Sequence, residues 1–552
     1  MHQPQYRDLI SQEYALPWTY LHAIKDYVDM AAHLEAHPAA RAVVNFAPLL
    51  LEQIADYARQ VDGFLHNGLA IRDPVLAALA RATQPSEPEG RLALIKAYVR
   101  ANEKRQINRF PAYRRLADFA HWVIAHPDVL PYVGDQFIAD LVVWFHLVWL
   151  GETVRRSDVR VRSLTDKGAE FSLHDRRELL SLIGEILTGL IGRYRRLAEI
   201  GQIELSVTPY AHPIGPLLLD FDSAREAMPN VELPLLAKYP DGETRTRWHI
   251  REGVATFERY FGFRPIGCWP AEGGVSAGYL RLLAESGFRW AATGEGVLRN
   301  SLTKAGGAPQ ARKEDWLYSP YDVANSGTAC FFRDDGMSDR IGFVFADWHA
   351  DDAAANLMHE LARIAETCRD RPDRVVSIIL DGENAWEHYP ENAYYFLDAL
   401  YRDLANHPRL RLTTFSEYLA THAPEPLPVM VAGSWVYGTF STWIGEAGKN
   451  RGWDMLGDAK RAFDLVAGSL EPAQREAAEQ QLAVCEGSDW FWWFGDHNPA
   501  ATVADFEHLF RQHLNNLYQL LGREPPEYLT QVFTRGGGEP LHGGTMLPGT
   551  AA

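Results

Sequence analysis

The alternation of short apolar strands with helical segments is the feature that most restricts how this chain can fold. Six strand-like stretches lie after residue 200, and helical patterns separate most of them. The stretches are residues 203–207, 266–269, 290–293, 329–333, 375–380 and 410–413. Alternating strands and helices favour a parallel sheet or barrel. With one more strand at 42–46 and a first strand that is cut short, we expect roughly seven or eight strands, an incomplete (β/α)7 barrel of the α/β class.

The length of 552 residues predicts more than one domain. Residues 61–200 are mostly helical by period, which indicates a helical insertion within a catalytic barrel at 1–423. Three prolines, Pro424, Pro426 and Pro428, indicate a linker. Beyond it, helical patterns predict a C-terminal helical bundle at 430–525 that contributes to the active site, followed by a loose tail at 526–552.

The charge and the cysteines exclude some classes of function. Lys and Arg number 54 and Asp and Glu 72, a formal charge of −18, which argues against nucleic acid or an anionic membrane as a partner. The four cysteines are far apart and form no CxxC pair, as expected for a reducing compartment. No signal peptide is visible at the start, and the apolar run at 137–150 predicts a buried helix. We therefore expect a cytoplasmic location.

Two carboxylates follow strands in a way that suits sugar chemistry. Glu272 comes directly after the strand at 266–269, in the sequence Trp-Pro-Ala-Glu-Gly-Gly, and Asp381 comes directly after the strand at 375–380. In a βα barrel both would lie at the carboxyl ends of parallel strands, where active sites form. Glycoside cleavage requires two facing carboxylates, one to attack or stabilise the sugar cation and one to protonate the leaving oxygen. A single carboxylate after a strand is more often part of a solvated loop, so the argument depends on the pair, each with a tryptophan nearby.

Five stretches resemble glycoside hydrolase family 57, and they lie in the family's order over most of the chain. They are His2-Gln3-Pro4; Gly201-Gln202-Ile203-Glu204 with His212-Pro213; Trp269-Pro270-Ala271-Glu272; Asp381-Gly382-Glu383; and Ser488-Asp489-Trp490-Phe491-Trp492-Trp493. The resemblance implies an incomplete (β/α)7 barrel, a helical region after it, and a retaining mechanism on α-glucans. Family members have a strand before His-Gln-Pro. Here only Met1 precedes it, so we expect that the sequence lacks part of its start.

The resemblance also implies site residues. Glu272 would be the nucleophile and Asp381 the general acid/base. The substrate-binding residues would be His2, Glu204, His212, Trp269, Glu383, Trp386, Asp489 and Trp492. Each histidine could instead be a framework residue, and a cluster as aromatic as 490–493 is expected to place at least one ring in the core.

The residues themselves leave the division of roles open. A nucleophile should stay ionised, whereas a general acid needs a raised pKa. The apolar strand before Asp381 would raise its pKa, but Glu383, two residues on, could share its proton. The assignment of roles therefore follows the resemblance.

Three segments resemble the amylopullulanase and α-amylase-like branch, namely residues 16–27, 440–446 and 487–493. We therefore predict a retaining hydrolase that cleaves α-1,4 bonds, with α-1,6 bonds as a further option, in starch, glycogen or maltodextrins. The alternative on the same site is a 4-α-glucanotransferase or a glucan branching enzyme, because transfer and hydrolysis differ only in whether sugar or water attacks the glycosyl-enzyme. The sequence gives no oligomeric state.

Two readings from other classes remain. A zinc-dependent deacetylase or mannosidase on a similar barrel would need a cluster of His and Asp ligands, and the best candidate is the segment from Asp347 to Asp352. A non-catalytic glucan-binding protein would be expected to lack one of the carboxylates, and both are present. We predict no cofactor and no metal.

Overall fold

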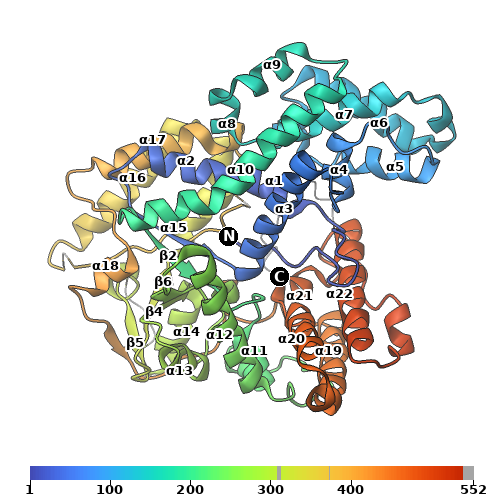
Figure 1. Ribbon diagram of the computed structural model, residues 1–552. Helices are drawn as coiled ribbons and strands as arrows, with labels where there is room; N and C mark the ends of the chain where they lie inside the picture. The colour runs from blue at the N-terminus through green and yellow to red at the C-terminus, as the bar shows by residue number, and fades with distance from the viewer. Residues whose placement is uncertain (308–311, 372, 384, 539–552) are drawn as a thin grey trace.

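The computed structural model describes residues 1–307, 312–371, 373–383 and 385–538. Its centre is a seven-stranded sheet in the order β1-β2-β3-β4-β6-β5-β7 (Figure 1). The strands are β1 (Ala42–Phe46), β2 (Ile203–Val207), β3 (Gly267–Cys268), β4 (Trp290–Gly294), β5 (Tyr321–Val323), β6 (Ala329–Arg333) and β7 (Glu425–Leu427). Every pairing is parallel except that of β5 with β6. The predicted α/β class is confirmed.

Two of the predicted strands are wrong as regular strands. Residues 375–380 meet β6 through one parallel bridge, from Ser377 to Arg333. Side chains bond to the backbone of this segment where a strand would pair with its neighbour. The Arg333 guanidinium donates to the carbonyl of Ile379, and Ser338 Oγ accepts from the N–H of Ile379. Residues 410–413 form no strand either. The side chain of Arg411 is 78% exposed, and Thr414 caps the helix that follows.

Two short strands escaped the sequence analysis, β5 and β7. The β7 strand lies in the segment that the prolines suggested as a linker, and it pairs with β5 at the end of the sheet order. Pro426 has no N–H to donate, and an outer strand of a sheet tolerates such a residue. Three-residue strands leave too little periodicity to detect.

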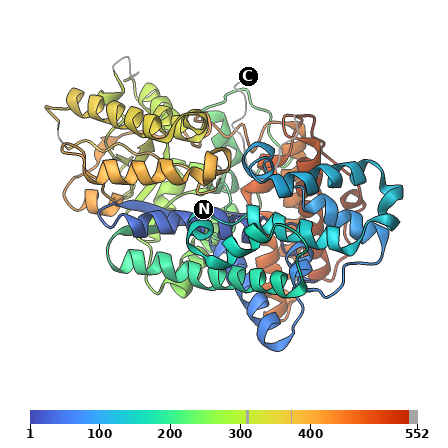
Figure 2. The same cartoon turned by 90° about the horizontal axis from the view of Figure 1, so that it is seen from above.

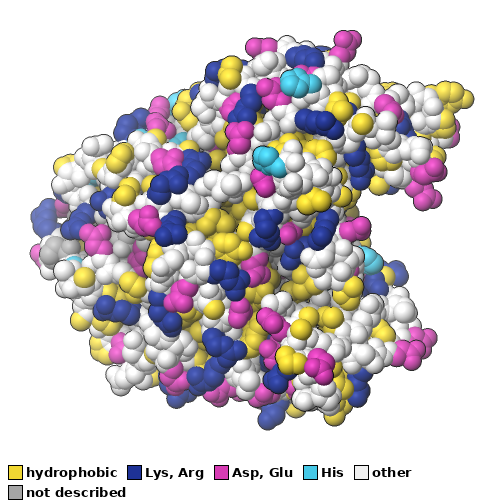
Figure 3. All heavy atoms as spheres, viewed as in Figure 1, with side chains coloured by type: hydrophobic (Ala, Val, Ile, Leu, Met, Phe, Trp, Pro, Cys, Tyr) yellow, Lys and Arg dark blue, Asp and Glu magenta, His cyan; other side chains and the backbone are white. Residues whose placement is uncertain are grey.

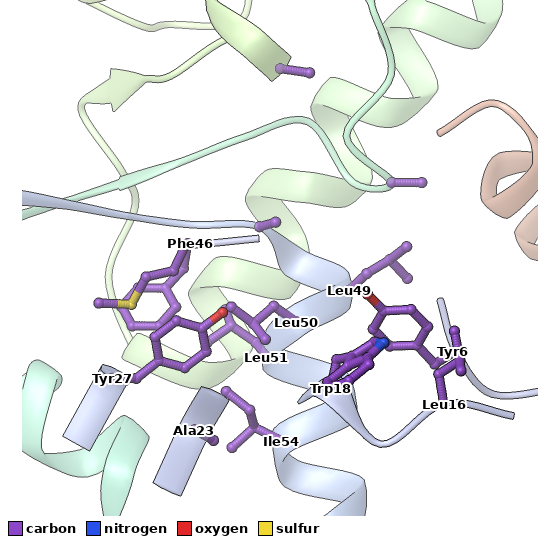
Figure 4. Close-up of a cluster of buried hydrophobic side chains, with 14 of the residues drawn as sticks. Tyr6, Leu16, Trp18, Ala23, Tyr27, Phe46, Leu49, Leu50, Leu51 and Ile54 are labelled. Atoms are coloured by element: carbon purple, nitrogen blue, oxygen red, sulfur yellow. The ribbon is translucent and has the colours of Figure 1, made fainter. Parts of the chain in front are cut away.

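The N-terminal helices pack on the sheet and form much of the core. They are α1 (Trp18–His22), the π-helical turn η1 (Ala23–Tyr27), α2 (Val28–Ala36) and α3 (Pro48–Asn67). Figure 4 shows α3 presenting Leu50, Leu51 and Ile54 to Ala23 and Tyr27, all of them buried. The start of the chain is held beside β1, because the Met1 amino group donates to the carbonyl of Asn45 at 3.0 Å.

The predicted helical insertion is present between β1 and β2. After α3 its helices are α4 (Pro74–Ala80), α5 (Pro88–Ala97), α6 (Pro111–Ala125), α7 (Asp135–Val148), α8 (Glu152–Ser157), α9 (Val159–Lys167) and α10 (Leu173–Glu199). A capping box between Ser172 and Asp175 begins α10. The apolar run at 137–150 is the buried face and end of α7, as predicted.

Between β2 and β7, helices connect most of the strands, as the alternating pattern predicts. They are α11 (Gly215–Leu219), α12 (Gly242–Phe261), α13 (Ala277–Glu285), α14 (Glu295–Lys304), α15 (Asp335–Asp339), the π-helical turn η7 (Arg340–Val344), α16 (Ala350–Thr367), α17 (Tyr394–Ala405) and α18 (Phe415–Leu419). In the described part of the chain, no helix is both long and apolar enough to cross a membrane.

The C-terminal helices are α19 (Ala447–Val466), α20 (Pro472–Cys485), α21 (Ser488–Trp493) and α22 (Ala500–Leu520). Figure 2 shows the insertion in cyan over these helices in red, and an ion pair of 2.6 Å joins Arg100 to Asp505 across them. On the face shown in Figure 3 the surface is indented between the two regions. In the predicted tail, residues 527–530 form a short helical turn with Leu529 buried. Residues 539–552 of that tail lie outside the described residues.

Candidate active site

Glu272 lies on a tight turn after β3, as the sequence predicts. Its φ is +54°, a left-handed conformation that is costly for a residue with a side chain, and Gly273 follows with φ +58°. The hydroxyl of Thr293, on β4, donates to the carbonyl of Gly273 and holds the turn. Glu272 is only 2% exposed. Strained backbone of this kind persists where the surroundings fix it, and it is common at active sites.

Trp435 is the partner of Glu272 that the sequence analysis missed. Its indole N–H donates to Glu272 Oε2 at 3.0 Å, and its backbone N–H donates to the Glu272 carbonyl at 3.2 Å. Its ring also meets Trp269 edge to face, with centroids 5.2 Å apart. The contact joins residues 163 positions apart, so no local pattern could have revealed it. Trp269 itself lies against the site as predicted.

The imidazole of His2 lies near two carboxylates, those of Glu272 and Asp489, which come from distant parts of the chain. Nε2 of His2 lies 3.1 Å from Asp489 Oδ1 and 3.6 Å from Glu272 Oε1. The backbone N–H of His2 donates to Glu383 Oε1 at 3.3 Å. His2, Glu272, Glu383 and Asp489 are all buried. The structure therefore brings together four of the predicted residues, one of them from α21.

His212 stacks on His2, with ring centroids 4.1 Å apart and planes 7° apart. Its Nδ1 lies 2.8 Å from the hydroxyl of Ser488. The ligand atoms of His2, His212 and Asp489 lie within 4.8 Å of one another, close enough to consider a metal ion. An imidazole binds a metal in its own ring plane. Because two stacked, nearly parallel rings share no common plane, one ion could not bind both in this arrangement.

The charges of this cluster shift its pKa values in opposite directions. Burial lowers the pKa of His2, but Asp489, Glu272 and Glu383 outweigh it and raise that pKa to about 10, so His2 is a cation at neutral pH. Burial and the charge of His2 hold the pKa of His212 well below its usual value, so His212 is neutral. A protonated imidazole has no lone pair for a metal, which agrees with the ring geometry.

The pKa of Glu272 is raised to about 8. Burial is the main cause; the charge of His2 opposes it, and the charges of Asp381 and Asp489 add to it. A nucleophile is expected to be ionised at neutral pH, so this shift differs from the simple expectation. Asp381 is one of the charges that add to this shift, so its carboxylate is close enough to act electrostatically on Glu272.

Asp381 follows the irregular segment 375–380 and is half-buried. The next residue, Gly382, faces Met1 so closely that a Cβ added there would come 2.5 Å from the Met1 side chain. Glu383 then turns inward to accept from Gln3 Nε2 at 3.4 Å as well as from His2. The segment is therefore fixed against the first residues of the chain.

Three predicted substrate-binding residues, Glu204, Trp386 and Trp492, contact residues outside the cluster of His2, Glu272, Glu383 and Asp489. Glu204 accepts from Trp290 Nε1 at 2.7 Å and from the backbone N–H of Ser416 at 2.9 Å, so its carboxylate holds the first turn of α18. Trp386 packs on Tyr389 and lines a small pocket between the insertion and residues 386–392.

Trp492 is half-buried against Trp443. Its neighbours Trp490 and Trp493 are core residues packed on Phe506, as expected for at least one ring of that cluster.

The segment proposed for zinc is dispersed. Asp347 pairs with Lys104 and Arg105, and the side chains of His349 and Asp351 are each 72% exposed. These residues converge on no shared point, so the zinc reading gains no support from them.

Comparison with known proteins finds a family for most of the chain and similar folds for its full length. The family model described as glycosyl hydrolase family 57 matches residues 1–431. The fold is similar to branching enzymes from Pyrococcus horikoshii (15% identity, TM-score 0.55) and Thermococcus kodakaraensis (14%, 0.56), each covering 100% of this chain and 98% of the other. It is also similar to an α-amylase from Thermotoga maritima (15%, 0.53; 96% and 94% covered). A search of curated protein sequences gives no match.

Proposed function

The chain belongs to glycosyl hydrolase family 57, and from that premise we propose that it is a retaining enzyme that hydrolyses α-1,4 bonds of starch, glycogen or maltodextrins. The observation that carries the proposal is the setting of Glu272. Its carboxylate is buried, accepts a hydrogen bond from Trp435, and lies near a histidinium and a second carboxylate, Asp381. A cation that develops at the sugar's anomeric carbon would be stabilised there.

The proposed reaction has two displacements. Glu272 attacks the anomeric carbon and forms a covalent glycosyl-enzyme, while Asp381 gives a proton to the leaving oxygen. Asp381, now ionised, then takes a proton from water, which attacks the same carbon and releases Glu272. Configuration is retained because it inverts twice.

Five neighbours of Glu272 have separate parts in this scheme. Trp435 orients one oxygen of Glu272, so the other can face the sugar. The charge of His2 favours the ionised form of Glu272, and Asp489 keeps His2 protonated. The neutral ring of His212 could exchange hydrogen bonds with a sugar hydroxyl, as could the carboxylate of Glu383.

Product analysis tests the reaction class. Maltoheptaose should give only shorter sugars, whereas a ladder of longer and shorter chains would indicate a glucanotransferase. New α-1,6 branches in amylose would indicate a branching enzyme. A trisaccharide from pullulan would add α-1,6 cleavage to the proposal. Absence of any product from the wild type on all three substrates would contradict the proposal and favour a glucan-binding protein.

The roles of the two carboxylates need a separate test, because a raised pKa is also what a general acid requires. Azide can replace a missing carboxylate, and the face from which it attacks reveals which one is missing. We expect Glu272→Gly with azide to give a β-glycosyl azide from an α-glucoside, by a single inversion. Asp381→Gly should instead give the α-azide, because Glu272 still forms the intermediate. The reverse pattern would exchange the two roles.

A further inference from the structure

Residues 434–439 form a turn that places one aromatic ring inside the site and another outside it. Trp435 contacts Glu272, whereas Tyr437, two residues on, is 52% exposed. Tyr437 has a φ of +56°, and Gly438 follows with +69°. A left-handed tyrosine is a real strain, and such strain persists at sites where a side chain must be presented.

The base of this turn is rigid. Ser434 Oγ donates to the carbonyl of Thr439 at 2.7 Å. Gly438 packs on Gly296, just after β4, so tightly that a Cβ at Gly296 would lie 3.0 Å from Gly438 Cα. The backbone of Tyr437 is therefore held by the same turn that carries Trp435.

A chain of contacts leads from Glu272 outward to Asp339. Beyond Trp435 comes Arg333, whose guanidinium lies 5.2 Å from the Trp435 ring centre. Arg333 is paired with Asp339 at 2.6 Å, and the Asp339 side chain is half exposed. Partial burial raises the pKa of Tyr437, and the charge of Asp339 adds to that rise.

A second exposed ring lies next to Asp339. Phe343 is 50% exposed and follows Asp339 by four residues, so both lie on one side of the continuous helix α15–η7. The turn η7 is π-helical, and π-helical turns are frequent at functional sites. Asp339 and Phe343 thus lie at the outer end of the contact path, and Tyr437 lies on the turn that carries Trp435.

We propose that Tyr437 and Phe343 form an outer subsite that holds glucose units of a long α-glucan beyond those at the cleaved bond. Sugar rings present C–H faces that pack on aromatic rings, and Asp339 can accept hydrogen bonds from their hydroxyls. We expect the ligand of this subsite to be an extended glucan, because Tyr437 lies on the same turn as Trp435, which contacts Glu272. This inference rests on the proposed function.

The test compares a long with a short ligand in the presence and absence of the Tyr437 ring. Tyr437→Gly removes the ring and also relieves the left-handed backbone, so misfolding is not expected. In a Glu272→Gln background, calorimetry would measure the affinities for maltoheptaose and maltotriose. We expect the ratio of the two affinities to fall about 3- to 10-fold in Tyr437→Gly and in Phe343→Ala, the loss of an aromatic contact. The same ratio of kcat/KM should fall in the active enzyme.

Controls separate this inference from general damage. Tyr437→Phe keeps the ring and should keep the ratio. Tyr132→Ala removes a ring that is 89% exposed on the insertion, and the ratio should not change. An unchanged ratio in both Tyr437→Gly and Phe343→Ala would overturn the subsite, even in an active enzyme. If the wild type makes no product but the affinity ratio falls as expected, the hydrolase proposal fails and the glucan subsite stands. If neither sugar binds, both fail.

Discussion

The two carboxylates of the site are held in very different ways. Glu272 is on a strained turn that Thr293, Trp435 and a continuous part of the sheet fix from several sides. Asp381 follows a segment that meets the sheet at a single bridge and is fastened by the side chains of Arg333 and Ser338. The difference indicates that Glu272 is positioned mainly by backbone and sheet, whereas the segment of Asp381 is positioned mainly by side chains and by the first residues of the chain.

The largest effects are expected from replacing the carboxylates of Glu272 and Asp381 themselves. Glu272→Gln should lower kcat by about 10⁴-fold or more on any substrate, because no covalent intermediate forms. Asp381→Asn should lower kcat by about 10²- to 10⁴-fold on maltooligosaccharides. It should have much less effect on the first step with a dinitrophenyl maltooligosaccharide, whose leaving group needs no proton. Burst kinetics with that substrate checks both. Equal losses for both variants on both substrates would remove the distinction.

The hydrogen bond that holds the Glu272 carboxylate can be removed by substituting Trp435. Trp435→Phe removes the N–H that bonds to the Glu272 carboxylate, a charge-assisted bond of about 1.5–3 kcal/mol, so kcat/KM should fall roughly 10- to 100-fold. Trp490→Phe is the matched control, because its buried N–H donates at 2.8 Å to the carbonyl of Val484. It should reduce stability and leave kcat/KM within about 2-fold of wild type. Equal kcat/KM losses in the two variants would mean that Trp435 acts only through packing.

The raised pKa of Glu272 predicts a pH dependence. With a pKa of about 8 the group is mostly protonated below pH 8, so the kcat/KM of an enzyme that needs it ionised should rise about tenfold per unit as pH approaches 8 from below. His2→Gln removes the cation that opposes the shift, so the rising limb should move to higher pH. A limb that falls through pH 8 in the wild type would assign Glu272 as the general acid.

The smallest effects are expected from removing the hydroxyls of Thr293 and Ser338, which anchor the segments of Glu272 and Asp381. Thr293→Val removes the buried bond to Gly273 and should cost about 1–2 kcal/mol of unfolding free energy with kcat little changed. Ser338→Ala removes the acceptor for the N–H of Ile379, in a half-buried segment. It should lower kcat a few-fold, with less than about 1 kcal/mol lost. Urea unfolding and initial rates measure both. A larger stability loss in Ser338→Ala would mean that the Asp381 segment is the rigid one.

Sequence reasoning located the site well where the chemistry follows a local pattern. The strand before Glu272 and the motifs carrying His2, His212 and Asp489 were identified from the residues and the family resemblance, and the fold brings these side chains together. It could not find Trp435, since that contact depends on how the chain returns to the sheet after β7. Nor could it place Glu204, because a carboxylate near a strand end can serve either the pocket or the start of a helix, and here Ser416 takes it.

The long sequence separation between His2 and Asp489 has a consequence for when the active site can form. The ion pair that keeps His2 charged joins residue 2 to residue 489, one of the most distant contacts in the chain. Contacts so far apart form late, after long stretches have already folded. During synthesis, the barrel could therefore be assembled while the polypeptide is still without activity, and docking of α21 would complete the active site.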